Sequence, residues 1–95
     1  MMKAGTRLEK TLRAGQFALT VEVGPPRGPN PEDVRRKAQQ HKGIADGYNV
    51  TDNQTAVVRM SSIAGAKLLQ DAGCEPVMQM TCRDRNRISL QSDLL

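Results

Sequence analysis

Polar side chains that can carry acid–base or hydrogen-bonding chemistry stand near the ends of three short apolar segments. Glu22 ends the first segment, Thr51 ends the second, and Gln79 and Thr81 end the third. A carboxylate in this place is a candidate general acid, because it can hold a proton beside a bound substrate. Amide and hydroxyl groups match the ring nitrogens and carbonyls of a planar heterocycle. The residue types therefore predict a site for a cyclic ligand.

The elements that position these residues can be read from periodicity and capping signals. Each apolar segment alternates like a strand, and each is followed by a loop and a stretch with helical spacing. The expected strands cover residues 17–23, 44–51 and 76–81. The expected helices begin after Thr6, at Pro31, at Val57 and at Arg87. The strand starts recur at about 30 residues, the length of a βαβ unit.

This rhythm predicts a parallel α/β fold, in which the carboxyl ends of the strands form one rim that carries the chemistry. A (β/α)8 TIM barrel needs eight such units and about 250 residues. The 95 residues would supply about the first three βα units. We therefore expect residues 1–95 to be the N-terminal fragment of a single barrel domain.

Glu22 is the strongest candidate for catalysis. In the expected strand it points away from Phe17, Leu19, Val21 and Val23, which need helices to cover them. In a barrel it would point inward at the catalytic end, where partial burial favours a protonated carboxyl. The alternative is that Glu22 pairs with a basic residue and only supports the rim.

Composition excludes several classes of function. Fourteen basic and ten acidic residues give a net charge of +4, and one Phe, one Tyr and no Trp leave few aromatic rings for nucleic-acid stacking. Cys74 and Cys82 have no zinc or redox spacing, so no metal site is expected. The sequence contains no membrane-spanning stretch and no signal peptide, which indicates a cytoplasmic protein.

The basic run at residues 83–87 leaves two interpretations open. Arg83, Arg85 and Arg87 precede an expected helix N-terminus, where anions bind readily. The simpler interpretation is a solvated loop that pairs with its own acids, at least for two of the three arginines.

Longer blocks of sequence resemble a known family. VEVGPP at residues 21–26, NVTDNQ at 49–54 and QMTCRDRNR at 79–87 look like the N-terminal part of methylenetetrahydrofolate reductase. TAVVRMSS at 55–62 and LQSDLL at 90–95 extend the likeness over nearly the whole chain.

The resemblance implies a flavin-dependent barrel in which FAD takes hydride from NAD(P)H and reduces 5,10-methylenetetrahydrofolate to 5-methyltetrahydrofolate. It implies that Glu22 is the general acid that helps to open the five-membered ring of the folate. It also implies that Thr51, Asp52, Gln54 and Gln79 lie against FAD. The implied partners are the folate substrate and a further copy or an electron-donating subunit, with neither nucleic acid nor membrane.

The chain departs from the family pattern in two respects. Val23 and Gly24 stand where many members carry aromatic residues, and Gln79 stands where several carry histidine. In addition, the residues that later strands supply to flavin and folate do not occur before Leu95, so the chain alone is expected to be inactive. The alternative function is a truncated, non-catalytic barrel segment that associates with a partner chain. A small module that binds phosphates through its arginines is a third interpretation.

Overall fold

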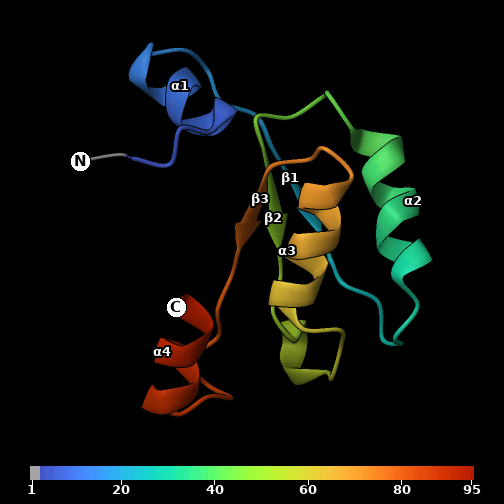
Figure 1. The fold of residues 1–95 in the computed structure, drawn as a ribbon. Helices are drawn as coiled ribbons and strands as arrows, with labels where there is room; N and C mark the ends of the chain where they lie inside the picture. Colours follow the sequence, from blue (N-terminus) through green and yellow to red (C-terminus); the bar gives the residue numbers. More distant parts are fainter. Residues whose placement is uncertain (1–2) are drawn as a thin grey trace.

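The structure, a computed structural model, describes residues 3–95 (Figure 1). A single parallel sheet has the strand order β1-β2-β3 and is formed by β1 (Thr20–Val23), β2 (Gly47–Val50) and β3 (Pro76–Met78). The four α-helices are α1 (Arg7–Arg13), α2 (Pro31–His41), α3 (Ser62–Asp71) and α4 (Arg87–Leu94). The strands run from α1 toward α4, so these two helices lie near opposite ends of the sheet (Figure 1). The order confirms the predicted parallel α/β arrangement with crossover helices between successive strands.

The hydrophobic core lies between the sheet and the two crossover helices, which cover the same face (Figure 1). The strand residues Val23, Val50 and Met78 are in register and point toward this side. They pack with Val34 of α2 and Leu69 of α3. Small, β-branched and aliphatic side chains fill this core, as the low aromatic content requires.

Helix starts follow the capping residues that the sequence offers. The Thr6 hydroxyl accepts a hydrogen bond from the Glu9 amide at 3.2 Å, and the Asn30 side chain accepts one from the Glu32 amide at 3.0 Å. The Asn86 side chain accepts one from the Ser89 amide at 2.9 Å. Such caps satisfy donors that have no partner within the first helical turn. The predictions for these three helix starts are confirmed.

The first strand is shorter than predicted. It begins at Thr20, and Phe17, expected to face a helix, is 90% exposed. Backbone pairing with the neighbouring strand sets this limit, because the Asp46 amide donates to the Leu19 carbonyl and residues before Leu19 have no strand beside them. The other two strands are likewise limited to Gly47–Val50 and Pro76–Met78.

The third helix begins at Ser62, not at Val57 as predicted. The Arg59 amide donates to the Asn53 side chain, and the Met60 amide donates to the Pro26 carbonyl. These bonds hold the segment as a loop across the carboxyl end of the sheet. Ala64, on the outer side of α3, is exposed. The buried positions of α3 are Ser62, Gly65, Ala66 and Leu69.

The opposite face of the sheet carries Glu22, Asn49 and Val77, which are paired across the three strands. At the amino end of this face, α1 makes contact: a Cβ placed on Gly47 would lie 3.3 Å from Leu8 Cδ2. Toward the carboxyl end the face is open, since Glu22 and Val77 are both exposed. A barrel would enclose this face.

Candidate active site

The sheet brings the predicted site residues to one edge. Val23, Val50 and Met78 are in register as the last residues of their strands, so the segments that follow them share the carboxyl rim. The Gln79 amide donates to the Val50 carbonyl at 3.0 Å, which continues the pairing past the end of β3. Carboxyl ends of parallel strands are the usual location of active sites in α/β proteins.

Glu22 lies on the open face, one residue before the end of β1. Its register partner on β2 is Asn49. The carboxylate is exposed, so residues 3–95 do not supply the partial burial predicted for it. No ion pair of Glu22 with another described residue occurs, and the alternative in which a basic partner holds it is not supported within this part of the chain.

Thr51 is 5% exposed, and its hydroxyl has no hydrogen-bond partner among the described residues. A buried polar group without a partner costs about 1–3 kcal/mol. The neighbouring backbone is glycine: a Cβ at Gly24 would lie 3.7 Å from Thr51 Oγ1. The hydroxyl therefore lies against the Gly24 backbone at the end of β1, and its hydrogen-bonding capacity is unused within residues 3–95.

Asp52 is held by the chain itself. One carboxylate oxygen accepts from the Thr81 amide at 2.8 Å, and the other accepts from the Arg85 guanidinium at 2.9 Å. Its carbonyl also accepts from the Thr81 hydroxyl at 2.8 Å. The side chain is 1% exposed. Asp52 therefore connects the end of β2 to the segment after β3.

The two glutamines lie at the rim with free side chains. Gln54 starts a short 3₁₀ turn, Gln54–Ala56, and is exposed. Non-glycine residues with positive φ surround it: Asn53 at 47° and Thr55 and Ala56 at 59°. Gln79 is also exposed, and its backbone carbonyl accepts from the buried Ser62 hydroxyl at 2.7 Å. The amide groups of both glutamines remain available to a ligand.

Comparison with known proteins decides the family. The sequence profile of methylenetetrahydrofolate reductase matches residues 7–95. The chain belongs to the methylenetetrahydrofolate reductase family. This assigns it to a family of oxidoreductases of folate-linked one-carbon metabolism. No curated protein and no solved structure matches the chain in the corresponding comparisons.

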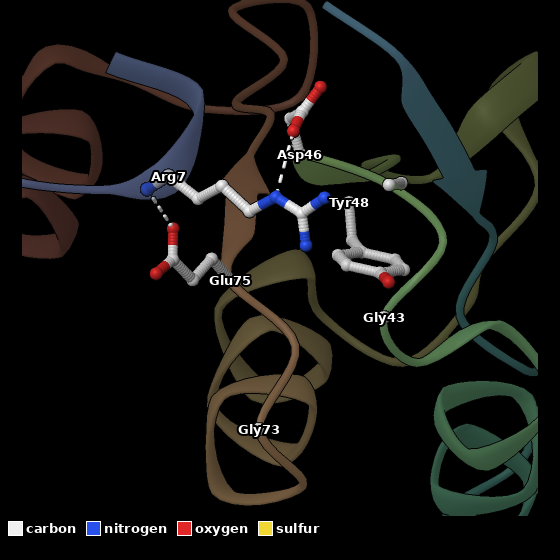
Figure 2. A pocket seen from close by; sticks show the side chains of 7 residues that line it. Arg7, Gly43, Asp46, Tyr48, Gly73 and Glu75 are labelled. Carbon is white, nitrogen blue, oxygen red and sulfur yellow. Dashed lines mark hydrogen bonds and ion pairs between the residues drawn. The ribbon is translucent and has the colours of Figure 1, made fainter. Parts of the chain in front are cut away.

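One further hollow of this reductase-family chain lies at the other end of the sheet. The cavity of about 90 Å³ is lined by Arg7, Asp46, Tyr48, Glu75 and nearby backbone. Figure 2 shows the Arg7 side chain crossing it toward Asp46, while the Arg7 amide donates to the Glu75 carboxylate. These contacts fasten α1 to the amino ends of β2 and β3. Residues at this end of a parallel sheet usually serve stability.

The sequence interpretation gave Arg59 no role and left Arg85 open between an anion contact and a self-paired, solvated loop. Arg83 pairs with its neighbour Asp84 at 2.7 Å, as the simpler interpretation predicted. Arg85, in contrast, is only 12% exposed and bonds Asp52. Arg59 donates to the Pro25 carbonyl at 3.3 Å, and its Nε is buried without a hydrogen-bond partner in residues 3–95. Nothing in the local sequence separates Arg85 from the exposed arginines beside it.

Two further features bear on the class of site. Residues 3–95 contain no cluster of three or more His, Cys, Asp and Glu side chains that would hold a metal ion. Within the same range, no helix has the length and apolar character needed to span a membrane.

Proposed function

We propose that residues 1–95 form the first three βα units of a (β/α)8 barrel that reduces 5,10-methylenetetrahydrofolate to 5-methyltetrahydrofolate. Electrons would come from NAD(P)H through FAD. The family match supports the reaction class, and one structural observation carries the site: the parallel strands place Glu22, Thr51 and Gln79 at one carboxyl edge. Residues 1–95 by themselves are proposed to be inactive, because a closed barrel must cover the open face.

FAD, when bound, would accept hydride from the nicotinamide and deliver it to the folate. The Thr51 hydroxyl, which has no hydrogen-bond partner among the described residues, would bond a ring that carries hydrogen-bonding atoms. The exposed amides of Gln54 and Gln79 would bond the same ring system or its ribityl chain. Asp52 would act indirectly, by holding the rim segments together, because its carboxylate oxygens already accept hydrogen bonds from Thr81 and Arg85.

Glu22 would hold the catalytic proton. Its carboxyl group is exposed on the face that a barrel encloses, beside Asn49 on the next strand. There it would protonate a ring nitrogen of the folate and so help the five-membered ring to open. An amide of the same size keeps the shape of the side chain but cannot donate this proton.

The test is Glu22→Gln in the flavin-loaded reductase with its barrel complete, with Glu32→Gln on the exposed surface of α2 as the matched control. Stopped-flow absorbance should show flavin reduction by NAD(P)H at nearly the parental rate. Folate turnover should fall by about 10²-fold or more, the size of a general-acid contribution. Comparable folate turnover in the Glu22 variant would remove the catalytic role.

The second candidate is a non-catalytic segment that associates with a partner chain. The observation that favours it is the sheet itself, whose edge strands β1 and β3 each have one side unpaired by residues 3–95. Unpaired edges are templates for association. The absorption spectrum of the purified protein separates the candidates, since a bound oxidised flavin is yellow and the second candidate binds none. A cytoplasmic location and a homo-oligomer or electron-donating subunit remain part of the first proposal.

A further inference from the structure

One buried ion pair joins the segments that form the rim. Arg85 Nη2 lies 2.9 Å from Asp52 Oδ1, and Arg85 Nη1 lies 3.5 Å from Asp93 Oδ2. The exposed fractions are 12% for Arg85 and 1% for Asp52. The ion pair of the neighbouring Arg83, with Asp84, is exposed and local, although Arg83 Nη2 also donates to the Asn53 carbonyl at 3.0 Å. Arg85 links its own segment to Asp52 after β2 and to Asp93 of α4.

The orientation of Asp52 determines where the segment after β3 is held. Its second carboxylate oxygen accepts the Thr81 amide, and its carbonyl accepts the Thr81 hydroxyl, both at 2.8 Å. A buried carboxylate that loses the cation hydrogen-bonded to it is strongly destabilised. Without Arg85, Asp52 would turn toward water and release Thr81. The planar, multi-donor guanidinium suits this place, because it hydrogen-bonds Asp52 and at the same time pairs electrostatically with Asp93.

The last helix depends on the same arginine. No residue of α4 is buried, and Ile88 and Leu94 on it are 70% and 72% exposed. Arg85 connects α4 to the rim, because it pairs with Asp93 on the helix and with Asp52 after β2. The position of α4 beyond the carboxyl ends of the strands is visible in Figure 1.

We propose that Arg85 is a positioning residue of the rim: acting through Asp52, it fixes Thr81 and thereby the relative placement of the ends of β2 and β3. Thr51 precedes Asp52 directly, and Gln79 lies two residues before Thr81. Arg85 would thus set the geometry of two side chains that it does not touch. The consequence for bound flavin rests on the proposed function, whereas the positioning itself does not.

Amide hydrogen exchange measured by NMR on the full chain tests this. In Arg85→Met, the Thr81 amide should exchange about tenfold faster or more, as expected for a lost bond to a charged group. The Asp46 amide, which donates to the Leu19 carbonyl at the other end of the sheet, should be unchanged. Arg85→Lys should restore part of the Thr81 protection. Arg35→Met, which removes an exposed arginine from α2, is the control and should alter neither amide.

Unchanged Thr81 exchange in Arg85→Met overturns the proposal. Equal acceleration at Thr81 and Asp46 also overturns it, since Arg85 would then act on overall stability. If Arg85→Met does not fold, Arg85→Lys decides by the same comparison of the two amides. FAD titration of the parental protein tests the proposed function separately, so its failure leaves the exchange result intact. If FAD binds, the Arg85 variants should lower its affinity and shift its visible absorption spectrum. An unchanged FAD affinity and spectrum, together with faster exchange of the Thr81 amide, would refute the consequence for the cofactor.

Discussion

At the scale of single residues, Asp46 is the most heavily bonded carboxylate at the amino end of the sheet. It accepts from the Leu19 amide and the Arg7 guanidinium, both at 2.9 Å, and from the Thr11 hydroxyl at 3.3 Å. The hydrogen bond from the Leu19 amide is the main reason that the pKa of Asp46 lies below its ordinary value of 3.8. The Arg7 guanidinium lowers this pKa further. A lowered pKa in the folded state stabilises the fold above pH 3.8, and this contribution is lost as pH falls through the folded-state value.

We therefore expect Asp46→Asn to reduce the loss of stability in acid. Urea unfolding midpoints measured from neutral pH down to about pH 2 should converge for the parental and variant proteins at the acid end. Asp71→Asn, at an exposed carboxylate paired with Lys67 on α3, is the control and should follow the parental curve. A constant difference between the Asp46 variant and the parent at all pH values would contradict this account.

At the scale of elements, the approach of α3 to the sheet depends on Gly65. A Cβ there would lie 3.1 Å from Val50 Cγ1 and 3.4 Å from Pro25 Cγ. Both neighbours are fully buried, so neither can move aside. Alanine gains about 1 kcal/mol of helix propensity over glycine, but overpacking a core costs about 1–3 kcal/mol. The packing effect should win, because the contact is with rigid side chains.

We expect Gly65→Ala to lower the free energy of unfolding by about 1 kcal/mol in urea titrations. In a Val50→Ala background the obstructing methyl is absent, and the same substitution should be neutral or stabilising. This double-mutant cycle isolates the Gly65–Val50 contact. If the effects of Gly65→Ala and Val50→Ala on the free energy of unfolding are additive, the loss of stability does not arise from the Gly65–Val50 contact.

At the scale of the whole molecule, the two thiols report on the packed core. Cys74 is 1% exposed and donates to the Ala38 carbonyl at 3.6 Å, whereas Cys82 is exposed. Burial raises the pKa of the Cys74 thiol above its ordinary value of 9.0, so little thiolate forms near neutral pH. Because Cys74 lies between α2 and the β3 side of the sheet, exposing it requires the core to open.

We expect a thiol reagent to label Cys82 rapidly and Cys74 only as fast as the protein unfolds. In Cys82→Ser, the labelling of Cys74 should become faster as urea is added, in parallel with the loss of the helical circular dichroism signal. Cys74→Ser should retain only the fast phase. Rapid labelling of Cys74 in native buffer would indicate that α2 and α3 do not pack on the sheet as described.

Much of the fold was predictable because its signals are local. Capping side chains at Thr6, Asn30 and Asn86 determine helix starts within a few residues, and the spacing of strands and helices predicts parallel order. The start of α3 was not predictable. Its preceding residues have helix-compatible sequence, yet Met60 donates to Pro26, which lies 34 positions earlier. A bond over that distance leaves no local signal.

The sequence by itself determined the family, the parallel order and the rim on which Glu22, Thr51 and Gln79 stand, because periodicity and the family pattern are properties of the chain. Only the tertiary structure decided that Asp52 is enclosed by Thr81 and Arg85, and that one of three similar arginines is largely shielded from solvent. Burial and pairing depend on which segments meet after folding. Electrostatic partners 33 residues apart are brought together by the sheet and not by their local sequence.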